Sequence, residues 1–496
     1  MARIPGTLAG AAVALRPKPG AFAAPALLLA AASAIVEAQG AAMSCTLLLW
    51  TFLSLLPQPS APQPLLHASA LALHPPIAKT QRRTVRTPSK SARKLALRRS
   101  SRRPPLHRRR PQRAIPRWTL LQDTLLDSSL RYRMYQVAGA HPLRLHLLNF
   151  TPTPTTELRL IPALPNRAEP LPELIARCDS TLPDATILAA VNGYFWSARA
   201  SPVGLAASEG EALQLHRYKR WSSIAVDRYG RATIDTFLLE LSVRFPSGAQ
   251  LPIAGVNRRK DTAGVVLYTR FAGDTIPPPP PAPAPLGAEE ELLDSVPAPA
   301  VAAAEPLELR TRKLRLRYLS SPALNARTPC LVLDTASGAV SMPLRGCVLS
   351  VGSVVAADSL PRPGDTVWLE SQLLPRLRQQ IVLLCSGTPR LLRAGAVRIE
   401  AAQEGTVSAR FLHRRRARTA IGIDRYQRLL LLVVEQNGYS AGVTIEELAR
   451  LLRRLGAVEA LNLDGGSSSA LCIRGLGCFG SAHPVASALA IVRKRF

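Results

Sequence analysis

The sequence predicts an α+β fold with a mixed, twisted β-sheet core and few helices, in a single domain after a disordered basic N-terminal region. Three observations predict it. Short apolar runs separated by turn residues recur from Trp118 onward, as strands do. Residues 443–457 have the periodicity of a helix. That helix lies between two strand-like runs, and a strand–helix–strand order favours a sheet that contains parallel as well as antiparallel strands.

The strand-like runs are short, rich in β-branched or aliphatic residues and bounded by turn signals. The predicted strands are residues 143–150, 186–196, 346–357, 418–424 and 428–435, with a hairpin over 222–234. The run over 418–424 and the run over 428–435 are separated by a short polar turn, so we expect them to be adjacent in the sheet.

The predicted helix has signals at both ends. Thr444 and Glu447 have the spacing of a capping box, and Gly456 lies where a helix often ends on a glycine. Between them runs an apolar stripe at helical spacing, formed by Ile445, Leu448, Ala449, Leu452 and Leu455. These signals together specify a helix of about three turns.

About half of the net charge of +30 lies in one segment, because residues 79–117 contain 16 Lys or Arg and no Asp or Glu. Such a block repels itself and stays disordered. We expect residues 61–117 to be a Pro-rich basic linker, which either contacts a polyanionic surface or serves as a solvated spacer. Since this block of charge is confined there and aromatic side chains for base stacking are scarce, no specific nucleic-acid binding is expected.

Residues 1–60 have the composition of an apolar leader. Arg16 and Lys18 precede an uncharged run over 21–36, which small residues suited to cleavage follow. A start at Met43 is an alternative. The run is short for a membrane span, so no integral membrane domain is expected beyond this signal. The predicted location is exported, either periplasmic or extracellular, with a membrane tether if the segment stays uncleaved.

One folded domain is predicted over 118–496, with an insertion over 276–306 whose Pro and Ala residues cannot build a core. Six cysteines follow the leader, and they allow fifteen disulfide pairings. Cys472 and Cys478 flank a Gly-rich turn and could staple a hairpin. The sequence has no C-x-x-C or H-E-x-x-H motif, so no metal and no cofactor is expected.

The stretch LNLDGGSSSA, residues 461–470, is the strongest candidate for a functional site. In an extended strand its two leucines point into the core, while Asn462 and Asp464 share the other face. Gly465 and Gly466 allow positive φ and let a ligand approach backbone N–H groups. Polar side chains at the end of a strand lie where sheets of this kind usually bind ligands.

The residues alone leave structural alternatives open. An Asp-Gly turn that closes a hairpin also explains Asp464. Arg418 suits a bidentate grip on phosphate but equally a solvated surface, and Asn192 suits a turn. The stretch lacks the Lys of a Walker loop and the second glycine of a nucleophile elbow, so Ser467 is not expected to be a nucleophile.

In their order, these segments resemble the phosphodiester glycosidase domain family. Its signature is an Arg-Thr-Ala-hydrophobic-Gly strand, a Thr/Glu-capped helix and Asn-Leu-Asp-Gly-Gly-Gly-Ser-Ser, and this chain has RTAIG, TIEE and NLDGGSSS. Further segments that match in order are AAVNGYFW, SPVGLAASEGE, GVNRRKDTAGVVLYT, GCVLS and HPVASALAIV. The resemblance runs from about Arg131 to Phe496, outside the proline-rich insertion.

The resemblance implies hydrolysis of a sugar 1-phosphodiester of the N-acetylglucosamine-1-phosphodiester kind at the C1–O bond, in envelope or extracellular polysaccharide. The implied site residues are catalytic Asp464, Arg418 and Asn192, with substrate-binding Asn462, Gly465, Gly466 and Ser468. Arg418 and the glycine amides are expected to hold the phosphate and stabilise its charge as it leaves. Asp464 is expected to act at the anomeric centre.

Three positions depart from the family pattern. Its third glycine is Ser467 here, its Asp-Gly-Arg is Glu435-Gln436-Asn437, and the Arg of its closing strand is His483. Ser467 adds a Cβ where backbone approach matters, and the loss of two arginines weakens the grip on an anion. These departures favour the alternative function, a catalytically degenerate protein that binds glycan or assembles exopolysaccharide.

Overall fold

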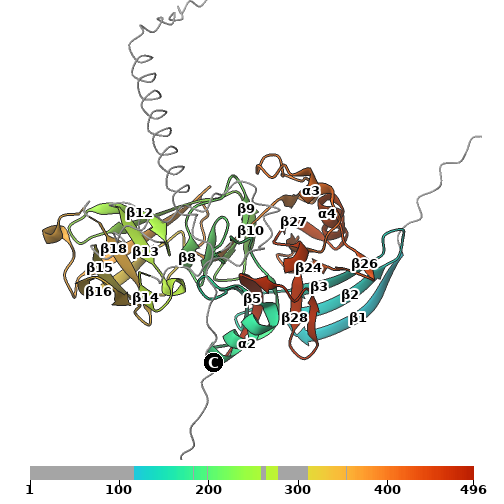
Figure 1. The fold of residues 1–496 in the computed structure, drawn as a ribbon, viewed down its shortest axis with the longest axis horizontal. Coiled ribbons are helices and arrows are strands. Elements are labelled where there is room, and N and C mark those ends of the chain that lie inside the picture. Colours follow the sequence, from blue (N-terminus) through green and yellow to red (C-terminus); the bar gives the residue numbers. More distant parts are fainter. Residues whose placement is uncertain are drawn as a thin grey trace, which may run out of the picture. The chain divides into compact units, whose positions relative to one another are not determined.

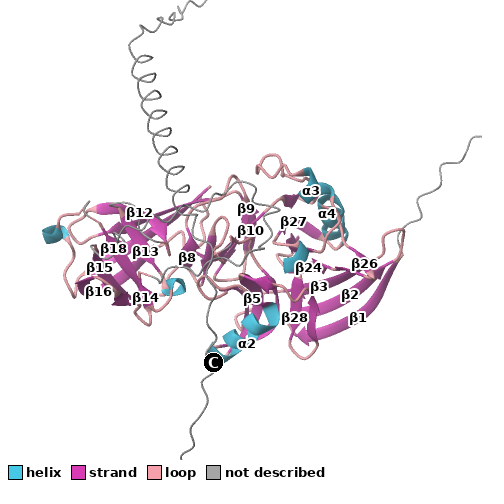
Figure 2. Ribbon diagram, viewed as in Figure 1, coloured by secondary structure: helices cyan, strands magenta, loops and turns pink. Residues whose placement is uncertain are grey.

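The computed structural model describes residues 117–181, 184–197, 199–258, 264–277, 311–352 and 355–495. Strands dominate this part of the chain and helices are few (Figure 2), so the predicted fold class is confirmed. The leader, nearly all of the basic linker and most of the proline-rich insertion lie outside the described residues. The three domain boundaries therefore stay predictions.

The largest sheet has the strand order β1-β2-β3-β24-β23-β27-β21-β22. Its strands are β1 (Trp118–Asp127), β2 (Leu130–Val137), β3 (Leu143–Phe150), β21 (Arg390–Arg393), β22 (Ala396–Val397), β23 (Arg418–Asp424), β24 (Leu429–Val434) and β27 (Ala457–Asn462). The strands predicted at 143–150 and 418–424 are found with those bounds. The predicted adjacency of 418–424 and 428–435 is confirmed, because β23 and β24 pair antiparallel.

The helices of the described residues are α2 (Leu171–Thr181), α3 (Ala409–His413) and α4 (Ile445–Arg454), with 3-10 turns η1 (Arg270–Ala272), η4 (Ala357–Ser359) and η5 (Gly466–Ser468). The capping box of α4 is confirmed: Glu447 N donates to Thr444 Oγ1 at 3.2 Å, and Thr444 N donates to Glu447 Oε2 at 2.9 Å. Gly456 has φ of +100°, which suits a glycine after the helix. The apolar face of α4 packs on the largest sheet (Figure 1).

The strand–helix–strand unit is present, with one strand inserted. β24 and β27 both pair antiparallel with β23, so they run parallel to each other on either side of it. In the described part of the chain, the hydrogen-bonded parallel pair is β12 with β13. The sheet system is thus mixed as predicted, but α4 connects two strands that are not neighbours.

The remaining strands form two five-stranded sheets, a closed barrel and three short ribbons. The first five-stranded sheet contains β10 (Ala232–Asp235), β9 (Ser222–Asp227), β20 (Ile381–Gly387), β7 (Ala206–Ser208) and β8 (Glu211–Gln214). The barrel contains β11 (Leu238–Arg244), β12 (Gln250–Val256), β13 (Val265–Tyr268), β18 (Gly346–Val351), β15 (Arg312–Tyr318), β16 (Arg327–Ser337) and β19 (Thr366–Leu374). The ribbons are β14 (Thr275–Ile276) with β17 (Val340–Ser341), β25 (Gln436–Asn437) with β26 (Ser440–Ala441), and β5 (Glu169–Pro170) with β30 (Pro484–Val485).

The second five-stranded sheet brings the site strand β6 next to the hairpin that follows the glycine loop. It contains β29 (Gly477–Gly480), β28 (Ala470–Ile473), β6 (Ala185–Asn192), β31 (Ser487–Lys494) and β4 (Thr156–Pro162). The expected staple is confirmed, since a disulfide joins Cys472 and Cys478 across β28 and β29. The other described cysteines, Cys178, Cys330, Cys347 and Cys385, are buried thiols. No helix within the described ranges is long and apolar enough to cross a membrane.

A buried carboxyl on β8 is expected to make stability depend on pH. Burial raises the pKa of Glu211 to about 7, and Arg270, whose Nε lies 3.3 Å from Glu211 Oε1, only partly offsets it. A carboxyl whose pKa is raised by folding contributes stability at low pH that is lost as pH rises through that value. We expect the free energy of unfolding to fall by roughly 2–3 kcal/mol between pH 5 and pH 8.

Urea unfolding at a series of pH values measures this dependence. Glu211→Gln carries no titrating group at this position, so its unfolding free energy should change much less over the same range. An equal slope in wild type and variant would show that other groups cause the dependence.

Candidate functional site

Segments far apart in the sequence meet at the end of β27. Asn192 closes β6 and is 1% exposed, and its Nδ2 donates to the backbone oxygen of Asp464 at 2.8 Å. Its Oδ1 accepts from Thr419 Oγ1 at 2.6 Å and from Ala470 N at 3.2 Å. Asn192 therefore fixes the backbone of the loop from within the fold and does not face solvent.

Asp464 is the most open of the predicted catalytic groups. It lies two residues after the end of β27 and is half-buried, as are Gly465 and Gly466. Its Oδ1 accepts from Gly465 N at 2.9 Å, which sets the orientation of the carboxylate. The loop thus presents a positioned carboxylate on a rigid backbone, which is what acid, base or nucleophilic chemistry requires.

Arg418 lies next to this loop across two paired strands. Ala420 of β23 is opposite Asn462, the last residue of β27, and Leu463 N donates to Thr419 O just beyond that pair. A Cβ on Gly465 would lie 3.6 Å from Arg418 Cδ. Arg418 therefore lies against the glycine loop that follows Asp464.

The guanidinium of Arg418 is buried without a carboxylate partner in the described part of the chain. Its Nη2 donates to Phe411 O at 2.6 Å and to Arg414 O at 3.4 Å, and its Nε donates to Val443 O at 3.5 Å. The side chain is 2% exposed. Burial, together with the nearby charge of Arg416, lowers the pKa of Arg418 to about 10. The site thus contains a buried cation that only carbonyl oxygens balance.

The two loop glycines do not form the expected amide cradle. Gly465 N donates to Asp464 Oδ1, and Gly466 N donates to Ala417 O at 2.8 Å, so both donors are already used within the protein. Gly466 has φ of +62°, where an L-residue is strained. A Cβ on Gly465 would approach Ala417 O to 3.3 Å. These glycines shape the loop, and their amides are bonded to the Asp464 carboxylate and to the backbone of Ala417.

Asn462 and Ser468 are the other two residues predicted to contact substrate. Asn462 is 0% exposed, and its Nδ2 donates to Thr388 O at 2.6 Å. Thr388 N returns a bond to Asn462 O at 2.9 Å. Ser468 lies in η5 and is 8% exposed. Both side chains are buried in this structure, and their role as substrate contacts stays a prediction.

The departures from the family pattern have local explanations. Ser467 lies in η5 and is not among the residues with positive φ, so its Cβ causes no backbone strain. Glu435 Oε1 lies 2.7 Å from His146 Nε2, and its Oε2 accepts from Asn437 Nδ2 at 2.6 Å. Burial acts to raise the pKa of Glu435, but these contacts hold it below its usual value. His483 is exposed.

Two functional candidates were missed at the level of sequence. Thr419 is 0% exposed and holds Asn192, and Thr388 holds Asn462. The sequence does single out Thr419. It is a hydroxyl residue in a mostly apolar strand, and its side chain points to the face opposite that of Arg418. Within the described residues, no cluster of His, Cys, Asp or Glu could hold a metal ion.

Comparison with known proteins agrees with this site. Residues 345–492 match the model of the phosphodiester glycosidase family, a range that includes β23, α4, β27 and the glycine loop. The resemblance to this family is therefore confirmed. The bovine N-acetylglucosamine-1-phosphodiester alpha-N-acetylglucosaminidase is 33% identical over 118 residues, 22% of this chain and 22% of that protein. The human protein of the same name is 31% identical over 118 residues, 22% of this chain and 23% of that one.

These alignments span less than a quarter of the curated relatives. A solved structure, a hypothetical protein from Synechocystis, superposes with a TM-score of 0.52 at 19% identity, covering 76% of this chain and 64% of that one. At this identity the likeness supports the fold alone.

Proposed function

We propose that this protein hydrolyses a glycosyl phosphodiester at the sugar C1–O bond and releases a phosphate-bearing alcohol. The observation that carries the proposal is the pairing of a half-exposed carboxylate, Asp464, with a buried cation, Arg418, that has no carboxylate partner in the described residues. A positive charge fixed in a low-dielectric site stabilises a departing phosphate without reorganisation. A carboxylate beside it suits attack at, or stabilisation of, the anomeric centre.

The substrate we propose is of the N-acetylglucosamine-1-phosphodiester kind, in envelope or extracellular polysaccharide. The support is the family match over residues 345–492 and the names of the bovine and human relatives. Export is proposed from the apolar leader, and contact with a polyanionic surface from residues 79–117.

Hydrolysis of an α-linked sugar 1-phosphodiester of a small alcohol in ¹⁸O-labelled water tests the bond that is cleaved. Cleavage at C1–O leaves the released phosphomonoester unlabelled, whereas cleavage at P–O puts one ¹⁸O into it. We expect an unlabelled phosphomonoester by mass spectrometry. The phosphate product is the one to read, because a reducing sugar exchanges its anomeric oxygen with water. A labelled phosphomonoester would make the protein a phosphodiesterase.

A glycan-binding protein without activity is the second candidate. The occupied amides of Gly465 and Gly466 favour it, because they withdraw two expected donors from the phosphate. Absence of turnover across a panel of sugars, combined with saturable binding of a sugar 1-phosphate, would support this candidate over hydrolysis.

A further inference from the structure

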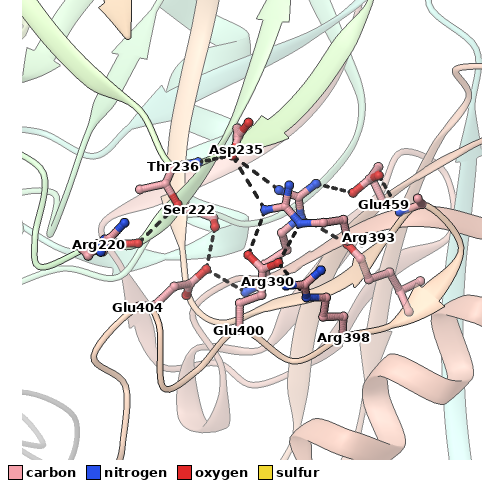
Figure 3. A network of polar contacts seen from close by, with 12 residues as sticks. Arg220, Ser222, Asp235, Thr236, Arg390, Arg393, Arg398, Glu400, Glu404 and Glu459 are labelled. Atoms are coloured by element: carbon pink, nitrogen blue, oxygen red, sulfur yellow. Dashed lines mark hydrogen bonds and ion pairs between the residues drawn. The ribbon is translucent and has the colours of Figure 1, made fainter. Parts of the chain in front are cut away.

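A second charged site lies away from Asp464. It is a cavity of about 510 Å³ that none of the sequence-predicted site residues lines. Four arginines contribute to its wall, Arg217, Arg220, Arg393 and Arg398. The carboxylates in the wall are Asp235, Glu400 and Glu404 (Figure 3). We call it the arginine cavity.

The carboxylates of the arginine cavity are already engaged. Glu400 accepts from Arg393 Nε at 2.7 Å and from Arg393 Nη2 at 3.0 Å, and Arg398 Nε lies 3.7 Å from the same group. Two guanidinium groups therefore share one carboxylate. Asp235 Oδ1 lies 3.6 Å from Arg390 Nη1 and 3.8 Å from Arg393 Nη2. These contacts leave a surplus of positive charge in the wall.

Glu404 is a buried hydrogen-bond acceptor in the cavity wall. It is 1% exposed, and it accepts from Ser222 Oγ at 2.5 Å, from Thr388 Oγ1 at 2.7 Å and from Arg390 N at 3.0 Å. Burial raises its pKa despite these bonds, so its charge is lost at a higher pH than that of an ordinary glutamate. Glu404 serves mainly as an acceptor that holds the cavity wall together.

Donors remain open in this cavity. Within the described residues, the guanidinium groups of Arg217 and Arg220 have no hydrogen-bond or ion-pair partner, and both residues are exposed. Arg390 does not line the cavity: it is 3% exposed, and its Nη1 lies 3.6 Å from Asp235 Oδ1 behind the wall. Guanidinium groups present paired N–H donors that match the oxygens of a phosphate.

A short chain of hydrogen bonds joins the arginine cavity to the candidate active site. Glu404 binds the hydroxyl of Thr388, and the carbonyl of Thr388 binds Asn462. Asn462 ends β27 two residues before Asp464. Glu404, Thr388 and Asn462 are buried, so the chain of hydrogen bonds couples the cavity wall to the strand before Asp464 through the interior of the protein.

We infer that the arginine cavity binds a phosphate group of the substrate other than the one at the scissile bond. This inference rests on the proposed function and gives it a substrate class: a glycan with more than one phosphodiester, in which neighbouring repeats occupy both sites. The net positive wall, the open donors and the link to β27 carry it. Free inorganic phosphate is the other source of the same chemistry, and the experiment separates the two.

Calorimetric titration of the full chain with inorganic phosphate at low ionic strength tests the cavity independently of turnover. Arg217→Ala combined with Arg220→Ala should weaken phosphate binding at least tenfold. Arg376→Ala combined with Arg378→Ala removes the same charge from an exposed loop, so it should bind as wild type does. All three proteins retain residues 79–117, so background binding there cancels from the comparison.

Glu400→Gln should change the affinity for phosphate in the opposite direction. It removes the carboxylate shared by two arginines, so phosphate should bind at least threefold more tightly, with folding checked by thermal melting. An arginine cluster that is only structural would give no gain. Equal affinity in all four proteins, or no saturable binding by wild type, would overturn the inference.

The source of the phosphate is tested with two substrates, one with a single glycosyl phosphodiester and one with two successive repeats. Arg217→Ala combined with Arg220→Ala should raise the KM of the longer substrate relative to the shorter at least fivefold. An unchanged ratio would overturn the assignment to the substrate and identify free phosphate as the occupant. If neither substrate turns over, the proposed function fails while the phosphate titration still decides the cavity.

Discussion

Arg418→Met is expected to lose roughly 10²–10³-fold in turnover while keeping most of its stability. Arg418 is a buried cation beside the glycine loop, and its Cδ lies 3.6 Å from a Cβ placed on Gly465. Methionine fills a similar volume beside the ring of Phe411, which the guanidinium carbon approaches to 4.7 Å. The substitution removes the positive charge that would stabilise the leaving phosphate, while the packing against Phe411 is kept.

Arg418→Ala is expected to behave differently in stability. It removes the contacts to Phe411 O, Arg414 O and Val443 O and opens a cavity under α3, so the free energy of unfolding should fall by about 2–4 kcal/mol. Methionine should cost less than half of that. The comparison thus separates the charge of Arg418 from its packing, and both variants should be poor catalysts.

Steady-state kinetics and urea unfolding of both variants measure these effects. Arg453→Met, at the exposed end of α4, is the matched control and should retain wild-type turnover and stability. Wild-type turnover in Arg418→Met would show that this arginine serves only to hold α3 and the segment before α4 against β23.

The elements around Asp464 could be predicted because their signals are local. Alternation gave the strands at 143–150 and 418–424 with their observed bounds, and the Thr444 capping box located the start of α4. The faces of the strand before the glycine loop were also predicted, since Leu461 and Leu463 belong to the core. Each of these signals depends on residues fewer than ten positions apart.

The barrel and the contacts of the site could not be predicted in this way. Barrel closure joins β11 to β19, and the Arg244–Glu370 pair across that seam spans 126 positions. Thr419 meets Asn192 across 227 positions, and Asn462 meets Thr388 across 74. Partners at such separations leave no periodic pattern, so Arg418 was predicted to grip phosphate without its carbonyl partners being foreseen.

The two loop glycines show what a sequence motif predicts about a site and what it does not. The match to the family signature identified Gly465 and Gly466 correctly as positions that need little side chain, as the φ of Gly466 shows. It could not show where their N–H groups point, because that depends on Ala417 and on the carboxylate of Asp464. Under the proposed function, the grip on phosphate would therefore have to come from side chains such as that of Arg418.

Asp464→Asn is expected to lower turnover by about 10³-fold or more, as removal of an acid, base or nucleophile commonly does. Two contacts of this position survive the substitution. An asparagine Oδ1 can still accept from Gly465 N, and the backbone oxygen at this position can still accept from Asn192 Nδ2. The free energy of unfolding should therefore stay within about 1 kcal/mol of wild type, as for other isosteric changes at half-exposed positions.

The matched control is Asp274→Asn, which removes an exposed carboxylate and should leave turnover unchanged.

Two other outcomes of the Asp464→Asn experiment have distinct meanings. Retained turnover would mean that the carboxylate only caps the turn at Gly465, so another group performs the chemistry. If wild type itself shows no turnover but both proteins bind a sugar 1-phosphate equally, the loop holds a glycan and the carboxylate is not part of its recognition. A large loss of turnover with unchanged stability would show that the carboxylate of Asp464 takes part in the reaction.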